Sequence, residues 1–207
     1  MIKRDPGNKV HRKRDPKIPP SLGPRFLDLQ MIAKGSYGIV YTAKDHHHND
    51  QECVVKVEGL FTPNKSLKNE AKILDHLKHK GMDGVPKIMC HDVTESVRYL
   101  AMECLGPSLY DVVKFCGGRL SAMTTLKIGY QLVTRLKDLH NNRIIHKDIK
   151  PFNITVGLGE KTNKMHLIDF GLSEFYKNRQ RYHIDLSNID QFIGTIRYAS
   201  LNSHHEI

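Results

Sequence analysis

Hydrophobic and polar positions alternate along the first part of the chain, which is the pattern of half-buried β-strands. The alternation is combined with β-branched side chains in three runs, at residues 26–33, 39–44 and 52–57. Gly35 and Gly38 separate the first two runs, and a polar stretch separates the second from the third. The pattern therefore predicts three antiparallel strands that follow one another as a meander.

Helical spacing begins at Ser66, which is a residue type that caps helices. Leu67, Ala71 and Leu74 follow at intervals of three or four residues, as one buried face of a helix requires. Beyond the Gly-Pro pair at 106–107 the pattern is mainly helical again. The elements expected after the meander are a helix over 66–78, strands near 87–91 and 97–102, helices over 108–115 and 121–140, and strands over 154–156 and 165–168.

The order of these elements places the strands mainly in the first half of the chain and the helices mainly in the second. Segregated strands and helices are typical of the α+β class. We expect two lobes joined at the Gly-Pro pair. The first is an antiparallel sheet with one helix, and the second is mostly helical. Clefts between such lobes commonly hold ligands.

The composition is that of a globular intracellular protein. The 207 residues are 39% hydrophobic and 26% charged, which suits one domain or two small lobes that share a core, and excludes a largely disordered chain. No apolar run is long enough to cross a membrane, and the charged opening residues do not form a secretory signal. The four cysteines have neither zinc-site nor disulfide-framework spacing, so we expect a reducing compartment, cytoplasmic or nuclear.

Positive charge is concentrated at the start of the chain. The formal net charge is +10, and residues 1–20 alone carry seven basic and two acidic side chains. Five of the nine prolines lie within residues 1–24, which disfavours regular structure there. We interpret residues 1–24 as a basic, proline-rich disordered arm. The arm is either a solvated tail or a segment that docks on acidic protein, nucleic acid or a nuclear-import receptor.

The residues best suited to chemistry lie in two segments of the second half. Residues 146–153 read His-Lys-Asp-Ile-Lys-Pro-Phe-Asn, and Asp169-Phe-Gly begins sixteen residues after Asn153. Asp169 and Asn153 offer the hard oxygen ligands that Mg²⁺ prefers. Lys150 can offset the charge of a transferred phosphoryl group, and Asp148 can accept the proton of an attacking hydroxyl. The set predicts phosphoryl transfer; the alternative is that these are turn residues with solvated carboxylates.

Two features of the first half fit the same chemistry. Lys56 ends the third predicted strand, and Glu70 in the following helix can hold a strand lysine that faces phosphates. Taken without Lys56, Glu70 would be interpreted as an exposed helix carboxylate. Gly35 and Gly38 lie in the turn between the first two strands, where glycine lets backbone amides approach a phosphate group.

Three further segments are distinctive when they occur together. Residues 102–109 read Met-Glu-Cys-Leu-Gly-Pro-Ser-Leu at the hinge. Residues 156–159 read Val-Gly-Leu-Gly, and residues 194–200 read Gly-Thr-Ile-Arg-Tyr-Ala-Ser. With the loops above, the chain resembles the eukaryotic protein kinases and, within that superfamily, is similar to the casein kinase 1 family. The resemblance covers about residues 26–203.

The resemblance implies a serine/threonine protein kinase that uses ATP and Mg²⁺, with a kinase N-lobe at 25–103 and a partial C-lobe at 104–207. It implies protein substrates with acidic or phosphorylated residues near the target Ser or Thr, and no membrane. Asp148 is implied as the catalytic base, and Lys150 as the residue that steadies the γ-phosphate. The other implied roles are magnesium binding by Asn153 and Asp169, substrate binding by Thr195 and Arg197, and nucleotide binding by Gly35, Gly38, Val40, Val54, Lys56, Glu70, Met102, Glu103 and Leu105.

Several positions depart from the family pattern. Ala33 stands at the first glycine of the phosphate loop, and Lys147 replaces the arginine before the catalytic aspartate. Val54 replaces an alanine above the adenine and Thr155 replaces an apolar residue below it, so we expect weaker nucleotide binding. The sequence ends at Ile207, where family members continue into further helices. This predicts an incomplete second lobe: a fragment, a shortened product or a chain completed by a partner.

Two other hypotheses stand beside an active kinase. The first is a catalytically weak or inactive nucleotide-binding scaffold, which Val54, Thr155 and the early end of the chain favour. The second is a nucleic-acid binder, which rests on the net charge alone and is disfavoured because an aromatic-basic recognition motif is missing. The histidines at 46–48 are interpreted as a solvated loop rather than as a metal site.

Overall fold

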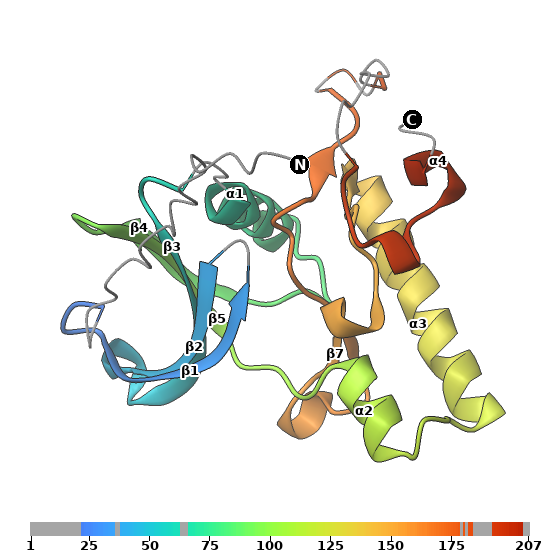
Figure 1. The fold of residues 1–207 in the computed structure, drawn as a ribbon, viewed down its shortest axis with the longest axis horizontal. Helices are drawn as coiled ribbons and strands as arrows, with labels where there is room; N and C mark the ends of the chain where they lie inside the picture. The colour runs from blue at the N-terminus through green and yellow to red at the C-terminus, as the bar shows by residue number, and fades with distance from the viewer. Residues whose placement is uncertain are drawn as a thin grey trace, which may run out of the picture.

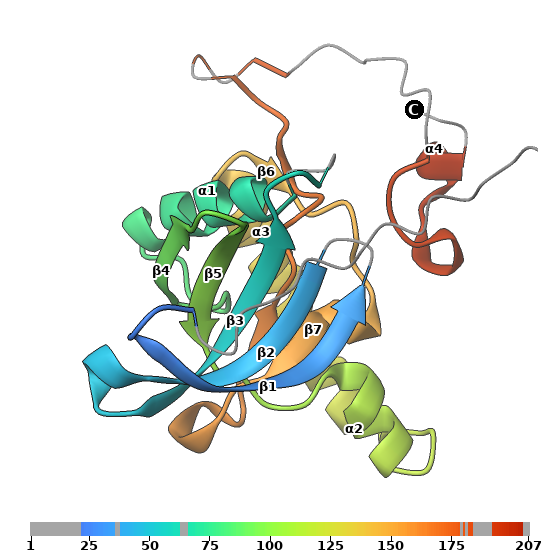
Figure 2. The same ribbon diagram turned by 60° about the vertical axis from the view of Figure 1, so that its left-hand side comes forward.

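The structure, a computed structural model, describes residues 22–35, 38–62, 66–178, 180, 182–183 and 192–204. Within them an antiparallel sheet with helix α1 forms one lobe, and helices α2 and α3 with several short strands form the other (Figures 1 and 2). The predicted α+β class is therefore confirmed. Most of the arm expected at 1–24 lies outside the described residues, and Leu22 within it is buried beside the sheet.

Five strands form the sheet of the first lobe, in the order β1-β2-β3-β5-β4 (Figure 2). All of its neighbouring pairs are antiparallel, and the three strands of the predicted meander pair in sequence order. Strand β5 then pairs with β3, so β4 lies at the edge. The elements are β1 Phe26–Gly35, β2 Gly38–Asp45, β3 Gln51–Gly59, α1 Ser66–His79, β4 Ile88–Val93 and β5 Val97–Glu103.

The alternation along β3 decides which of its side chains face the second lobe. Cys53, Val55 and Val57 are buried in a hydrophobic cluster on one face of the sheet. Val54 packs against the other cluster, to which α1 contributes, and Lys56 points to that same face because side chains repeat with a period of two. The alternation along β3 therefore places the Lys56 side chain on the face of the sheet that α1 covers.

The second lobe is built around the long helix α3. Leu139 of this helix is buried, and Leu132 and Leu136 pack against the same core, as their spacing predicts. Ser121 accepts a hydrogen bond from the Thr124 amide and so caps the helix. The elements of this lobe are α2 Leu109–Phe115, α3 Ala122–Asn141, β6 Ile144–Ile145, β7 Ile154–Val156, β8 Met165–Leu167, β9 Glu174–Phe175 and α4 Leu201–His204.

The shortest elements of the structure were not predicted from the sequence pattern. The two-residue strands β6 and β9 pair with each other, but two residues are too few to show an alternation. The histidines expected in a solvated loop form a 3₁₀ turn, His46–His48, whose side chains are exposed. The Asp45 side chain caps the turn by accepting from the His47 amide. None of the helices in the described ranges combines the length and apolar character that a membrane crossing needs.

Candidate active site

A cavity of about 590 Å³ lies between the two lobes. Its walls come from β1, β2, β3, β5 and α1 of the first lobe, from the segment after β5, and from the segments around β7 and β8 of the second lobe. Thr195 and Arg197 are not among its lining residues. The cavity brings together every residue predicted for catalysis, nucleotide binding or metal binding: Gly35, Gly38, Val40, Val54, Lys56, Glu70, Met102, Glu103, Leu105, Asp148, Lys150, Asn153 and Asp169.

Lys56 joins the two lobes at the back of this cavity. Its Nζ donates to Glu70 Oε1 at 2.6 Å and to Asp169 Oδ1 at 3.1 Å. Burial by itself would lower the pKa of Lys56, but the charges of Glu70 and Asp169 outweigh burial and raise that pKa, so the ammonium stays charged. Burial likewise works against ionised Asp169, and the Lys56 ammonium overcomes it and lowers the pKa of that carboxyl.

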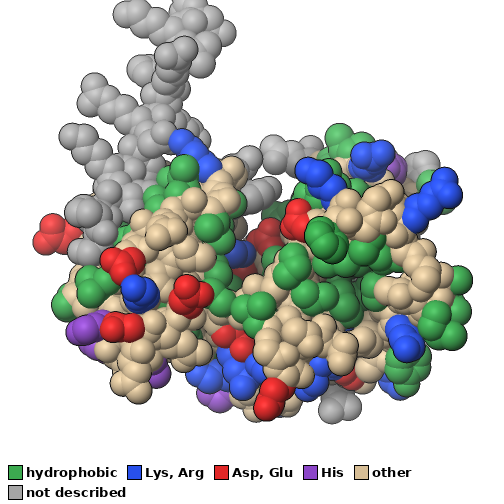
Figure 3. Space-filling view, turned by 90° about the horizontal axis from the view of Figure 1, so that it is seen from below, with side chains coloured by type: hydrophobic (Ala, Val, Ile, Leu, Met, Phe, Trp, Pro, Cys, Tyr) green, Lys and Arg blue, Asp and Glu red, His purple; other side chains and the backbone are tan. Residues whose placement is uncertain are grey.

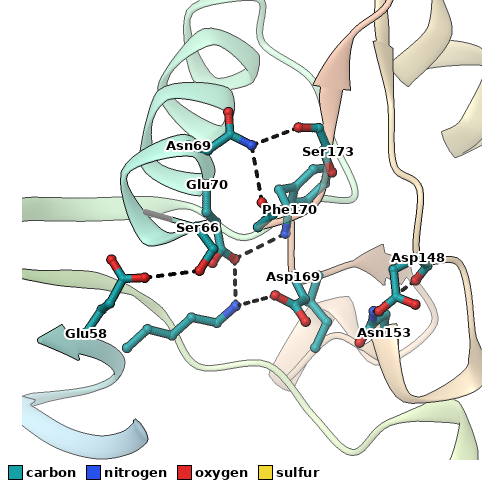
Figure 4. Close-up of polar contacts among 12 residues, drawn as sticks. Glu58, Ser66, Asn69, Glu70, Asp148, Asn153, Asp169, Phe170 and Ser173 are labelled. Carbon is teal, nitrogen blue, oxygen red and sulfur yellow. Dashed lines mark hydrogen bonds and ion pairs between the residues drawn. The ribbon is translucent and has the colours of Figure 1, made fainter. Parts of the chain in front are cut away.

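Helix α1 is held against β3 by a second carboxylate, Glu58, which is 1% exposed. The Ser66 hydroxyl, at the first residue of α1, donates to Glu58 Oε1 at 3.2 Å (Figure 4). Arg98 of β5 lies with its Nε 3.3 Å from Glu58 Oε2. A carboxylate at a helix N-terminus is favourable because the helix dipole is positive there. Glu58 therefore helps to set the position of the helix that carries Glu70.

The metal-loop candidate Asp169 is attached to α1 by two neighbouring residues of that helix. The Phe170 amide donates to Glu70 Oε1 at 3.3 Å. Asn69 Nδ2 donates to the carbonyl oxygens of Gly171 and Ser173 at 3.3 and 2.8 Å (Figure 4). Asn69 was not predicted as a site residue, because a single polar residue on a helix carries no signal of a contact about a hundred residues away.

Asp148 lies in a network of three side chains that donate to it. Thr195 Oγ1 donates to Asp148 Oδ1 at 2.7 Å, and Lys150 Nζ donates to Oδ2 at 2.6 Å and to Thr195 Oγ1 at 2.9 Å. Asn153 Nδ2 donates to Asp148 Oδ2 at 3.0 Å and to its carbonyl oxygen at 2.9 Å. Asp148 is 8% exposed, so these contacts fix its carboxylate while it still borders the cavity.

His146 supports this loop from beneath. The ring is 2% exposed, and burial lowers its pKa, so it is neutral near pH 7. Its Nε2 donates to the Ile168 carbonyl at 3.0 Å, and the Ser173 hydroxyl donates to the His146 carbonyl at 3.1 Å. These contacts join the Asp148 loop to the loop that carries Asp169, two segments that the sequence separates.

Three charged residues at the edge of the predicted site differ in their contacts. Arg197 is exposed and, within the described ranges, forms no ion pair. Lys147, which has a positive φ of 67°, donates to Glu174 Oε2 at 2.8 Å. Glu103 at the end of β5 accepts from the Lys87 amide at 2.9 Å and from Lys161 Nζ at 2.8 Å. The last contact ties the hinge to the turn between β7 and β8 and was not predicted.

The oxygen atoms left free by these contacts suit a hard metal ion. Asn153 uses its amide nitrogen on Asp148, so its Oδ1 is the atom available as a ligand. The Asp169 side chain is 43% exposed, and its Oδ1 contacts Lys56. Among the described residues, no three His, Cys, Asp or Glu side chains form a metal cage. Two oxygen ligands supplemented by phosphates and water are typical of Mg²⁺ sites.

Thr155, on the floor of the cavity, carries a buried hydroxyl without a partner. The residue is 5% exposed, and within the described structure its Oγ1 forms no hydrogen bond. An unsatisfied buried hydroxyl is destabilising.

We expect Thr155→Val to raise the free energy of unfolding by about 1 kcal/mol, because the variant removes the unpaired hydroxyl and keeps the shape of the side chain. Urea denaturation measures the change. Thr134→Val is the matched control, since the Thr134 hydroxyl donates to the Tyr130 carbonyl at 2.9 Å. A gain of the same size in both variants, or a loss in Thr155→Val, would contradict the prediction.

Comparison with known families adds one finding. A family model of the protein kinase domain matches residues 26–201. The match runs from the first strand of the sheet to the start of α4 and includes every candidate residue of the cavity.

Proposed function

Because the chain belongs to the protein kinase family, we propose that it is a serine/threonine kinase of the casein kinase 1 type that phosphorylates proteins at residues flanked by acidic or phosphorylated side chains. The family match supports phosphotransferase activity. The observation that carries the proposal is the pairing of two networks on one cavity: Lys56 with Glu70 and Asp169, and Asp148 with Lys150 and Thr195.

The residues that line the cavity support nucleotide binding. Val40, Val54 and Met102 provide apolar walls for a base, and Lys56 provides a charge for phosphates. Gly38 has a φ of +137°, and a Cβ there would lie 2.3 Å from the Val57 carbonyl oxygen, so this turn needs glycine. Asn153 and Asp169 are the residues that would hold Mg²⁺. The ion, when bound, neutralises phosphate charge and so favours attack.

Asp148 is the residue that receives the proton of the substrate hydroxyl. Its two oxygens are held by Thr195 and by Lys150 with Asn153, so the carboxylate is fixed before substrate arrives. Lys150 brings a positive charge next to that carboxylate and can contact the transferred group. Lys56, held by Glu70, orients the phosphates from the opposite side.

The casein kinase 1 assignment is supported by the turn that begins at Val156. A Cβ on Gly157 would lie 2.4 Å from the Lys161 carbonyl oxygen, so only glycine fits there. The resulting turn brings Lys161 to Glu103 in the hinge. The Val-Gly-Leu-Gly segment and the hinge segment, which both suggest this family, contact each other directly, because the Gly106 amide donates to the Val156 carbonyl at 2.8 Å.

A phosphotransfer assay tests the proposal. The chain, incubated with Mg·ATP, is expected to phosphorylate Ser and Thr peptides that carry acidic residues, and to prefer them to neutral peptides and to Tyr peptides. Arg197 is exposed and its guanidinium suits an anionic side chain, so Arg197→Ala is expected to weaken the preference for acidic peptides. Preference for Tyr, or no effect of acidic residues, would contradict the assignment.

Val54 and the buried hydroxyl of Thr155 in the nucleotide pocket favour a second candidate, a nucleotide-binding scaffold without turnover. Nucleotide-dependent thermal stabilisation without any transfer to peptides would support that candidate.

The contact of Asn69 with the metal loop leads to a further prediction. Asn69→Ala is expected to raise the Mg²⁺ concentration needed for half-maximal transfer about tenfold, because Asn69 holds the loop that carries Asp169 and supporting contacts around metal ligands commonly have effects of this size. Lys68→Ala, on the exposed side of the same helix, is the control. Magnesium titration at saturating peptide measures the change. An equal loss of thermal stability and rate in Asn69→Ala, with unchanged magnesium dependence, would reduce Asn69 to a structural residue.

A further inference from the structure

An ion pair joins the hinge to the turn between β7 and β8. Glu103, the last residue of β5, accepts from Lys161 Nζ with its Oε2 at 2.8 Å and from the Lys87 amide with its Oε1 at 2.9 Å. Glu103 lines the main cavity and its side chain is 18% exposed, whereas Lys161 is not among the lining residues. We call the contact of Lys161 with Glu103 the hinge clamp.

Lys161 is anchored in the second lobe. A Cβ on Gly157 would lie 2.4 Å from the Lys161 carbonyl oxygen, so the chain packs closely on itself at this turn. The same turn is bonded to α3, because the Gln131 side chain donates to the Asn163 carbonyl at 3.0 Å and accepts from the Met165 amide at 3.0 Å. The ammonium of the hinge clamp therefore belongs to the second lobe, while its acidic partner belongs to the first.

The hinge segment beside the clamp borders the end of the cavity where a base would bind. The Gly106 amide donates to the Val156 carbonyl at 2.8 Å, and the Val156 amide donates to the Pro107 carbonyl at 3.2 Å. Between these contacts and Glu103, the main-chain amide and carbonyl of Leu105 form no hydrogen bond with another described residue, and Leu105 lines the cavity. The clamp and the contacts with β7 thus hold a segment whose main chain is available to a ligand.

A second lysine of the same turn contacts the first lobe at a more exposed position. Lys164 Nζ donates to Asp83 Oδ2 at 3.0 Å, and the two side chains are 48% and 52% exposed. Arg135 of α3 also reaches Asp83, at 3.5 Å. Figure 3 shows the molecule from below, the side on which this turn lies in Figure 1, and basic and acidic side chains are next to one another there. Exposed ion pairs contribute little, so Lys164 is a matched comparison for Lys161.

We infer that the hinge clamp positions the hinge for a nucleotide base, and that Lys161 is therefore a positioning residue for nucleotide affinity although it lies outside the cavity. The inference rests on the proposed function, because that function places a base at the hinge. The clamp joins the lobes on the hinge side of the cavity, as Lys56 joins them through Asp169 at the back. Loss of the Lys161 charge lets the hinge move relative to β7, and a cavity that is correctly formed only part of the time binds its ligand more weakly by that fraction.

The test uses adenosine, which carries a base without the charge of phosphates. Thermal-shift titration of the full chain gives the dissociation constant of adenosine for the wild type and each variant. Lys161→Met is expected to raise this constant about fivefold, as the loss of one charge-assisted hydrogen bond allows. Lys164→Met is expected to stay within about twofold of the wild type. Lys161→Arg, which keeps the positive charge, is expected to restore most of the affinity.

A double-mutant cycle distinguishes positioning from a general loss of stability. Glu103→Gln keeps an oxygen for the Lys87 amide but loses the charge that Lys161 contacts. The double variant with Lys161→Met is expected to bind adenosine no more weakly than either single variant, because both changes remove the same contact. Additive effects, equal losses in Lys161→Met and Lys164→Met, or wild-type affinity in Lys161→Met would each overturn the inference and leave the proposed function intact.

A wild-type chain that transfers no phosphate would overturn the proposed function, and adenosine binding would still decide the inference. If the wild type binds neither adenosine nor Mg·ATP, hydrogen exchange decides whether the clamp positions the hinge, since it needs no ligand. The amides of Gly106 and Val156 are expected to exchange faster in Lys161→Met than in Lys164→Met, because the clamp opposes opening of the hinge. Equal exchange in the two variants would overturn the inference.

Discussion

Replacement of Asp148 by asparagine is expected to lower phosphate transfer by about 10²–10⁴-fold and to leave nucleotide binding unchanged. The side chain keeps its size, and its Oδ1 can still accept from Thr195. The variant loses the negative charge that holds Lys150 at 2.6 Å and that accepts the hydroxyl proton in the proposed mechanism. The loss therefore falls on the chemical step, which a single-turnover assay with radiolabelled ATP measures directly.

Two comparisons make this result specific. Nucleotide-dependent thermal shifts show whether Asp148→Asn still folds and binds ATP. Asp138→Asn on α3 makes the same chemical change at a partly exposed site away from the cavity, and it is expected to retain wild-type transfer. Wild-type rates in Asp148→Asn would remove Asp148 from the mechanism. A lost thermal shift would mean that the variant had altered the nucleotide site.

Lys56→Met is expected to abolish transfer and also to destabilise the fold by about 3–5 kcal/mol. Glu70 is 2% exposed and uses its Oε1 to accept from Lys56 at 2.6 Å, so removal of the lysine leaves a buried carboxylate without its counter-charge. The variant also frees Asp169, which contacts the same ammonium at 3.1 Å. Chemical denaturation measures the stability, and the peptide assay measures transfer.

The double variant Lys56→Met/Glu70→Leu separates the two effects. It removes both buried charges together, so stability is expected to return toward that of the wild type. Transfer is expected to stay abolished, because phosphates lose their cationic partner. Recovery of activity in the double variant would show that Lys56 has only a structural role. A destabilisation that persists in the double variant would contradict the prediction that the unpaired Glu70 carboxylate causes the loss of stability.

Much of the fold could be predicted from the sequence, since alternation and helical spacing are local consequences of burying one face of an element. The expected strand over 154–156 coincides with β7, and the expected helix over 66–78 differs from α1 by one residue. The two-residue strands β6 and β9 could not be predicted, because they are defined only by the pairing of Ile144 with Phe175 and of Ile145 with Glu174.

The candidate site, like the fold, contains residues that could be predicted from the sequence and residues that could not. The predicted catalytic and metal-binding residues Asp148, Lys150, Asn153 and Asp169 were recognisable from their types and spacing, and all four line one cavity, whereas Arg197 lies outside it. The residues that hold them in place were not recognisable. Asn69 on the metal loop and Lys161 on the hinge are ordinary polar residues in the sequence, and only the folded chain gives them partners.

The sequence by itself determined the kinds of elements and the chemical groups, because both depend on side chains within a few residues of one another. Only the tertiary structure decided that Thr195 bonds to Asp148, that Ser66 at the start of the helix bearing Glu70 donates to Glu58, and that Tyr110 stacks on Phe152. Each of these contacts joins segments whose approach depends on the packing of the lobes, which short-range patterns do not encode.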